Sequence, residues 1–294
     1  MRRFFALFLF FLCLQQLVSP RDTFAAELPL LYPTTFVTPD LSASKPASFH
    51  LPLLLSEWTK PATASGTIFA LEDYCVDVPI ILYHHTQPLQ MAELLGHAQL
   101  TVDSTIFDEQ MNYLVEQGYT TLSAEDFVHA LLQRQPLPEK SIVVTVDDAY
   151  DDNYTYAFMS AKKHKVIINF MIPTGLVNKP GYMMWDHLKE MKDNPYARIY
   201  NHTTNHAPLG LISDAEIDTE LASSSAALKQ ELGLEPTIFT YPYGSFSDIA
   251  IEKVKHAGFI GALSTIEGNH QCASKVMTLE RMHIGNAPLS FYGF

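Results

Sequence analysis

Two adjacent carboxylates and two spaced histidines are the residues of this sequence best suited to chemistry. Asp147 and Asp148 directly follow the apolar run at residues 141–146, and His202 and His206 follow another apolar run. Two neutral imidazoles and one carboxylate form a set that binds a divalent metal and leaves positions open for water and substrate. If residues 202–206 form a helical turn, both rings reach one ion. The second carboxylate would then hold a proton beside the metal.

Other polar clusters also follow apolar runs, and each has a simpler explanation when it is taken alone. An Asp-Asp pair after a strand is often a solvated turn or a helix N-cap, and paired histidines are common on surfaces. The Tyr-Pro-Tyr-Gly segment at residues 241–244 is typical of a turn, and His84 and His85 could be satisfied core histidines. What favours function is the shared position of these clusters, together with Arg281 and His283, at strand ends.

Alternating strands and helices are predicted from Val78 onwards. Continuous apolar strands separated by helices indicate a parallel sheet covered by helices, either a barrel or a doubly wound sheet. In both architectures active residues gather at the carboxyl ends of the strands. The strands are predicted at residues 78–83, 141–146, 166–172, 197–200, 237–241, 259–263 and 277–284.

The first residues are typical of a secretory signal peptide. Arg2 and Arg3 precede an apolar run at residues 4–14, and the small residues Ala25 and Ala26 follow. The apolar run is shorter than the roughly 20 residues that a membrane-spanning helix needs. We therefore expect that cleavage near Ala25 or Ala26 removes the signal peptide at residues 1–26. The product would have no stable membrane anchor and would be exported to the periplasm or the medium.

Residues 27–77 are rich in proline and interrupted apolar clusters, which predicts an N-terminal extension or linker before a domain at residues 78–294. The chain carries 19 basic and 32 acidic residues, a net charge of −13. This charge argues against nucleic acid as a partner. After cleavage only Cys75 and Cys272 remain, and they form either one disulfide or two buried thiols.

The combined motifs resemble the polysaccharide deacetylases of carbohydrate esterase family 4, which contain the NodB homology domain. Their form is most similar to the branch that acts on poly-β-1,6-N-acetylglucosamine. The resemblance extends from about Val78 to about Gly285, and its order is more specific than any single motif. It rests on residues 78–85, 144–154, 175–177, 181–185, 202–206 and 239–244.

The resemblance implies an α/β fold, a distorted (β/α) barrel of NodB type with fewer than eight complete units. It also implies that Asp148, His202 and His206 bind a divalent metal and that Asp147 is the catalytic base. Zinc is the expected ion, and cobalt or nickel would also suit an open site of nitrogen and oxygen ligands. The implied partner is an N-acetylglucosamine polysaccharide.

Further roles follow from the same resemblance. The backbone N–H of Tyr243 matches the oxyanion donor, and His283 is expected to be the catalytic acid. The residues expected to contact substrate are Tyr83, His84, Trp185 and Tyr241.

Three positions depart from the family pattern. Ala149 replaces the usual glycine after the aspartate pair, which could strain a backbone position of positive φ. Thr240 stands where an arginine is common, and we hypothesise that Arg281 pairs with Asp147 instead. The residues before His202 are Tyr200 and Asn201 rather than a small pair. None of these changes removes a metal ligand.

We therefore expect a metal-dependent hydrolase that releases acetate from N-acetylglucosamine units. One alternative is a carbohydrate-binding protein that has this fold but no turnover. Another is a metallophosphodiesterase, although such enzymes usually have two metal ions and additional cationic residues.

Overall fold

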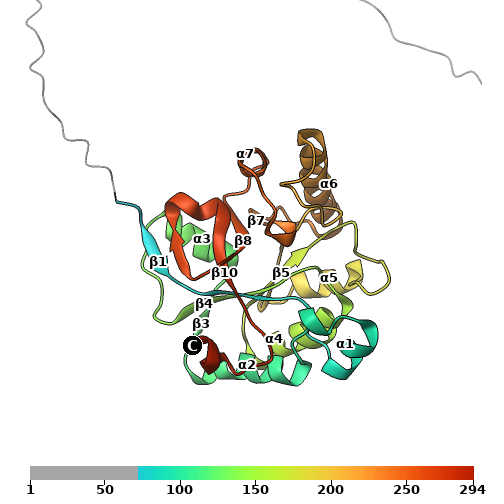
Figure 1. Cartoon of the computed structure of the whole chain (residues 1–294), viewed down its shortest axis with the longest axis vertical. Helices are drawn as coiled ribbons and strands as arrows, with labels where there is room; N and C mark the ends of the chain where they lie inside the picture. Colours follow the sequence, from blue (N-terminus) through green and yellow to red (C-terminus); the bar gives the residue numbers. More distant parts are fainter. Residues whose placement is uncertain (1–71) are drawn as a thin grey trace, which may run out of the picture. The chain divides into compact units, whose positions relative to one another are not determined.

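The structure is a computed structural model that describes residues 72–294 (Figure 1). The predicted signal peptide at residues 1–26 and most of the predicted extension at residues 27–77 lie outside the described residues. Among residues 72–294, none of the helices combines the length and apolar character that crossing a membrane requires.

Seven parallel strands close into a barrel. The closure is made by β2, which pairs with β4 on one side and with β10 on the other. The short strand β3 (Thr120–Thr121) flanks β4 outside the ring. The predicted distorted (β/α) barrel is therefore confirmed. In ring order the strands are β2 (Ile80–Tyr83), β10 (Leu279–His283), β8 (Gly261–Glu267), β7 (Ile238–Thr240), β6 (Ala197–Asn201), β5 (Ile168–Ile172) and β4 (Ser141–Val146).

Helices surround the strands (Figure 1). Side-chain caps mark the starts of two of them. The Ser123 side chain accepts a hydrogen bond from the Asp126 N–H, and Ser213 and Glu216 form a complete capping box. A π-helix at Asn153–Phe158 runs directly into α4. The helices are α1 (Leu89–Leu95), α2 (Ser104–Glu116), α3 (Ala124–Leu132), α4 (Met159–His164), α5 (Trp185–Lys192), α6 (Asp214–Leu232) and α7 (Asp248–His256).

The strands are apolar along their whole length because both of their faces are covered. Every residue of β2, β4 and β5 is buried. One core cluster lies against α2, α4 and α5, and a second packs around Phe127 and Val128 of α3. Continuous burial of this kind is typical of parallel strands with helices outside them.

The barrel is irregular at two joints. Strands β6 and β7 share a single register pair, Asn201 with Phe239. The register between β8 and β10 shifts between Leu279 and Arg281. Both irregular joints border strands that carry or precede candidate site residues.

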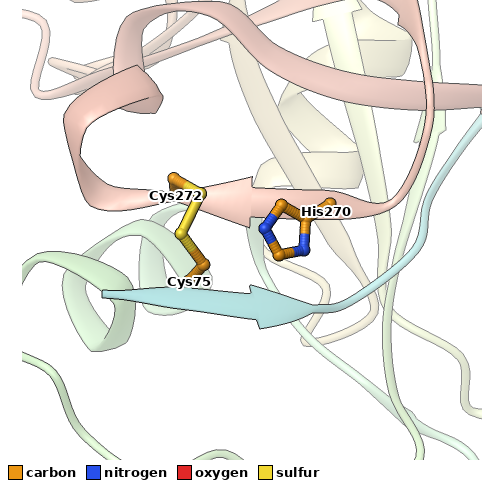
Figure 2. A group of neighbouring side chains, drawn as sticks. All are labelled: Cys75, His270 and Cys272. Carbon is orange, nitrogen blue, oxygen red and sulfur yellow. A yellow bond between two sulfur atoms is a disulfide. The ribbon is translucent and has the colours of Figure 1, made fainter. Parts of the chain in front are cut away.

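A disulfide fixes the start of the described chain to the barrel domain. Cys75 in β1 (Cys75–Asp77) is bonded to Cys272 in β9 (His270–Cys272), and the two strands pair antiparallel (Figure 2). Of the two alternatives left open by the sequence, the structure therefore has the disulfide.

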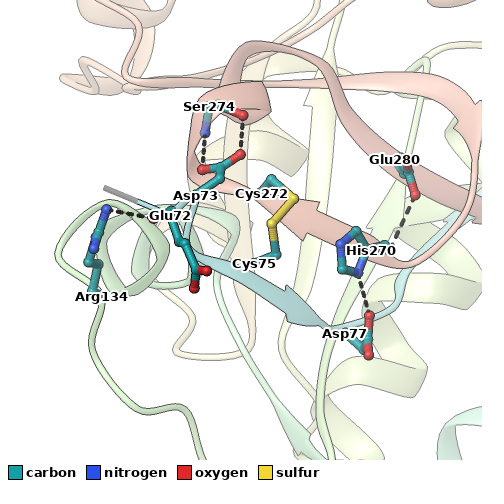
Figure 3. The surroundings of a disulfide bond; sticks show 9 residues. All are labelled: Glu72, Asp73, Cys75, Asp77, Arg134, His270, Cys272, Ser274 and Glu280. Atoms are coloured by element: carbon teal, nitrogen blue, oxygen red, sulfur yellow. Dashed lines mark hydrogen bonds and ion pairs between the residues drawn. A yellow bond between two sulfur atoms is a disulfide. The ribbon is translucent and has the colours of Figure 1, made fainter. Parts of the chain in front are cut away.

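Polar contacts surround this disulfide (Figure 3). The Asp73 carboxylate accepts hydrogen bonds from the backbone and hydroxyl of Ser274. Asp77 lies 2.7 Å from Nδ1 of His270. The last residues of the predicted extension thus pack on the barrel domain.

Candidate active site

Three possible metal ligands converge where β4 and β6 end. Ligand atoms of Asp148, His202 and His206 lie within 4.8 Å of one another. Nε2 of His206 is 3.0 Å and Nε2 of His202 is 3.4 Å from Oδ1 of Asp148. Asp148 and His202 are buried and His206 is half-buried, so the group is accessible from one side. The structure thus brings together the three side chains that the sequence suggested as ligands.

The chemistry of these donors fits a divalent cation. Nδ1 of His202 lies 2.8 Å from the Thr240 carbonyl, which can only accept, so this nitrogen carries the proton. The lone pair is then on Nε2, which faces Asp148. Oδ1 of Asp148 is buried and has no hydrogen-bond partner of good geometry. A carbonyl that orients a ligating histidine in this way is a recurrent feature of metal sites.

Unusual backbone angles turn these ligands inward. Asp148 and Ala149 have φ of 76° and 57°, and Thr203 and His206 have φ of 64° and 57°. Positive φ costs energy in residues other than glycine and persists where surrounding contacts impose it. The strain expected at Ala149 is therefore present. Residues 202–206 form a loop with left-handed bends rather than a helical turn, and this loop still brings both histidines to Asp148.

The loop that carries both histidines is held by one buried carboxylate of α6. Oε2 of Glu220 accepts hydrogen bonds from the N–H groups of Thr204 and Asn205 at 2.9 and 2.8 Å. Oε1 accepts one from the Asn205 side-chain amide at 2.7 Å. On the other side, the Gly175 N–H donates to the Thr204 carbonyl at 2.7 Å. The sequence interpretation missed Glu220, because only the folded α6 brings it to the loop.

Asp147 is the second buried carboxylate, and it faces Arg281 from β10. The guanidinium donates two hydrogen bonds to Asp147, at 2.9 and 2.8 Å, and the Arg281 side chain is fully buried. Nε of Arg281 donates to the Ser264 carbonyl at 2.6 Å. Burial by itself would raise the pKa of Asp147, but Arg281, His202 and His84 together outweigh it, so that the pKa is lowered. Asp147 is thus a charged carboxylate with a fixed orientation.

His84 lies among the charges of this site. Burial lowers the pKa of its imidazole, while the Asp147 and Asp148 carboxylates act in the opposite direction. His283, the expected acid, is different: its side chain is 54% exposed and Nδ1 is 3.1 Å from Glu267. Of the two histidines, His84 is the one whose charge state responds to both aspartates.

The residues expected to contact substrate fall into two groups. Tyr83 and Tyr241 are fully buried, and the Tyr83 hydroxyl donates to Gln110 at 2.8 Å. Neither ring can stack on a sugar, so this expectation is wrong for both, because each ring packs in the hydrophobic core. Trp185 is half-buried at the start of α5.

Tyr243 borders the ligand group. Its ring centroid lies 4.4 Å from that of His206, and its side chain is 70% exposed. Its φ is 59°, inside a short 3-10 helix at Pro242–Gly244. Tyr243 therefore places its ring at the open side of the ligand group, next to His206.

Cys75, His270 and Cys272 also lie close enough to share a metal. Their sulfur atoms are bonded to each other, so this group offers no thiolate ligands. Among residues 72–294, Asp148, His202 and His206 are thus the one compact group with free donor atoms.

Comparisons with known proteins agree with this geometry. Residues 134–262, which include the aspartate pair and both histidines, match the family model for polysaccharide deacetylases. These residues thus form a polysaccharide deacetylase domain, the domain of an amide-hydrolysing enzyme. This family includes carbohydrate esterase family 4, which the motifs resemble.

Two relatives and one structure show how far the similarity extends. The chain is 24% identical to YxkH of Bacillus subtilis, which is provisionally named a polysaccharide deacetylase, over 82% of this chain and 87% of that protein. It is 23% identical to the poly-β-1,6-N-acetyl-D-glucosamine N-deacetylase of Escherichia coli, over 64% of this chain and 34% of that one. The chain thus matches about a third of the length of the Escherichia coli deacetylase.

The structure of Streptococcus pyogenes deacetylase PplD in complex with acetate has a TM-score of 0.67 and 27% identity to this deacetylase. The match covers 71% of this chain and 92% of that chain. The similarity therefore includes the barrel as well as the motifs.

Proposed function

We propose that this protein removes N-acetyl groups from N-acetylglucosamine units of a polysaccharide and releases acetate, with the help of a divalent metal. The observation that carries the proposal is the placement of Asp147, paired with Arg281, beside the ligand group of Asp148, His202 and His206. Amide hydrolysis needs an activated water, a site for the oxyanion, and a proton for the leaving nitrogen. The site offers a residue for each need.

Asp148, His202 and His206 would hold the metal, and zinc suits this set of nitrogen and oxygen donors. Such an ion supplies Lewis-acid polarisation of the amide carbonyl and lowers the pKa of water toward about 7. Cobalt or nickel would fit the same donors.

Asp147 is the proposed general base. Arg281 keeps it ionised in spite of its burial, so it can accept a proton from water at neutral pH. The bidentate contact also fixes the plane of the carboxylate. The Tyr243 N–H is the proposed donor to the oxyanion, and a donor of this kind contributes about 3–4 kcal/mol in comparable sites.

We assign the proton transfer to the leaving nitrogen to His84 rather than to His283. His84 lies close enough to Asp147 and Asp148 for both to influence its pKa, whereas His283 is exposed and pairs with Glu267. Because burial lowers its pKa, His84 is neutral in the free protein. It would therefore receive the proton that Asp147 has accepted from water and deliver it to the leaving nitrogen, which leaves both groups as they began.

The substrate is proposed from the relatives. The Escherichia coli relative is named for poly-β-1,6-N-acetyl-D-glucosamine, so we propose this polymer as the first substrate to test. Export is supported by the disulfide, because such bonds persist in oxidising compartments. A biofilm matrix is one setting in which an exported enzyme meets such a polymer.

The decisive experiment measures acetate release from N-acetylglucosamine oligomers, before and after metal removal with a chelator. We expect release that stops on chelation and returns with zinc. Asp147→Asn should lower kcat at least 100-fold while bound metal, measured by atomic absorption, stays at the wild-type level. His84→Gln should lower kcat far more than His283→Gln does.

The other functions give different results. Bound metal and oligomer binding without acetate release would favour a carbohydrate-binding protein. Hydrolysis of a phosphodiester to a phosphomonoester and an alcohol, in place of acetate release, would favour a metallophosphodiesterase. Either outcome would contradict the deacetylase proposal.

A further inference from the structure

A groove of about 470 Å³ lies at the start of α1 and beside the segment that follows Asp148. Polar groups of His85, Gln87 and Asp151 line it together with apolar side chains of α1. The roles assigned so far to the catalytic residues do not use this groove. A polymer substrate has sugar units on either side of the reacting unit, and these units need a surface next to the site.

A stack of rings joins the groove to the metal ligands. The His85 ring lies 3.6 Å from the Tyr150 ring on one face and 4.4 Å from the His97 ring on the other. His85 and His97 line the groove, and Tyr150 follows Asp148 by two residues. The His85 ring therefore connects the groove to Tyr150, which lies two residues after Asp148 of the ligand group.

His85 is fixed in this stack by Asp152. Nδ1 of His85 is 2.5 Å from one carboxylate oxygen of Asp152, and the other oxygen accepts the Thr86 N–H at 2.7 Å. Asn153 also donates to this second oxygen, at 3.1 Å. The Asp152 carboxylate is thus fully engaged with protein groups, and its role is to hold the wall of the groove.

Asp151 is the carboxylate that remains available. Its side chain is 57% exposed, and its nearest charged partner is Nδ1 of His187 at 3.5 Å. That nitrogen accepts the Met184 N–H at 3.3 Å, so its lone pair faces that donor and it has no proton for Asp151. None of the described residues that line the groove is lysine or arginine, so the negative charge has no fixed counter-ion there.

The opposite wall is apolar. Met91, Leu94 and Leu95 of α1 are 50%, 83% and 55% exposed, respectively. A binding site with a mainly apolar lining and a few polar groups suits a pyranose ring, which has an apolar face and a hydroxylated edge.

We propose that this groove binds a sugar unit next to the one being deacetylated and that Asp151 selects a unit that already carries a free amine. This inference rests on the proposed function, because the free amine is the product of that reaction. A protonated amine complements an unpaired carboxylate, whereas an acetylated unit offers no charge. The enzyme would then act preferentially beside units that it has already converted.

The test compares two tetramers of β-1,6-linked N-acetylglucosamine, one fully acetylated and one with a single free amine. Asp151→Asn should raise KM for the amine-bearing tetramer at least five-fold more than for the acetylated one, and added salt should reduce the difference in the wild type. Asp186→Asn is the matched control, since it removes an 86% exposed carboxylate on α5. It should change neither KM.

Two outcomes would overturn the proposal: an equal change for both tetramers, or no change for either. Leu94→Ser should weaken both substrates together, and an unchanged KM would argue against the apolar wall. If the wild type releases no acetate from any oligomer, the proposed function fails instead. Calorimetric binding of a glucosamine tetramer to wild type and Asp151→Asn then tests the groove alone.

Discussion

At the scale of single residues, the site depends on a buried ion pair. Asp147 and Arg281 lie 134 positions apart in the sequence, and both side chains are almost completely removed from solvent. A buried pair of this kind contributes little net stability, but removing one partner leaves a charge without compensation.

Arg281→Met should therefore destabilise the fold by about 3–5 kcal/mol, measured by urea unfolding. Adding Asp147→Asn to that variant should restore part of the loss, since the uncompensated charge is then gone. Arg198→Met provides the comparison, because Arg198 contacts only backbone carbonyls of Pro195 and Ala197. An equal loss in both single variants would argue against the importance of the ion pair.

The same pair predicts a pH dependence of stability. The pKa of Asp147 is lowered in the folded protein relative to the unfolded value of about 3.9. Asp147 therefore contributes stability above that unfolded pKa, and this contribution is lost as the pH falls through the lower, folded pKa. Between about pH 5 and 3, the unfolding free energy of wild type should fall more steeply than that of Asp147→Asn. Parallel pH profiles would contradict this expectation.

Residue types and spacing predicted much of the site but not all of it. The ligand trio was visible because each member follows an apolar strand. Glu220 could not be identified from the sequence, since a glutamate in an amphipathic helix looks like any exposed acidic residue until the position of the helix in the fold is known. Tyr83 and Tyr241 were misjudged because the sequence does not distinguish a ring that faces substrate from one that faces the core.

At the scale of elements, α6 supports the loop of the metal ligands. Its carboxylate at Glu220 holds two backbone N–H groups of a loop whose φ angles are strained. Groups that orient ligands in this way typically change metal affinity 10–100-fold when they are removed.

Glu220→Ala should weaken zinc affinity about 10–100-fold in a competition titration with a chelating dye. Glu220→Gln should restore most of it, since the Asn205 amide can turn to present its oxygen to the new donor. Glu231→Ala, on the same helix but with contacts only to Gln230 and, at 3.9 Å, to Lys189, should leave the affinity unchanged. Equal zinc affinities in all three variants would show that the loop keeps its conformation without Glu220.

Strand and helix positions were largely predictable, because continuous burial and capping residues leave clear local patterns. The prediction of the strand at residues 141–146 matches β4, and the capping box at Ser213 starts α6. The closure of the barrel was predicted from the family resemblance rather than from the sequence pattern. Strands that pair but lie far apart in the sequence leave no local signal of their pairing. The strands β1 and β9 were missed since three-residue strands show no periodicity.

At the scale of the whole molecule, the disulfide closes a covalent loop between positions 197 residues apart. Closing a long loop restricts the unfolded chain and typically stabilises a protein by about 2–4 kcal/mol, up to about 5. The bond also attaches β1 to the domain.

Reduction with a thiol should lower the unfolding free energy by about 2–5 kcal/mol, measured by denaturant unfolding with and without reductant. The variant Cys75→Ser/Cys272→Ser should show the lower stability in both conditions and no response to the reductant. Identical stability of wild type in both conditions would contradict the expected contribution.

The covalent loop ends at Cys272, and β10 begins only at Leu279. The strand β10 is therefore outside the cross-linked part and is held by noncovalent contacts, among them its pairing with β2 and β8 and the hydrogen bonds of Arg281. A chain truncated before Leu279 would thus lack both the strand that closes the ring and the cation that faces Asp147.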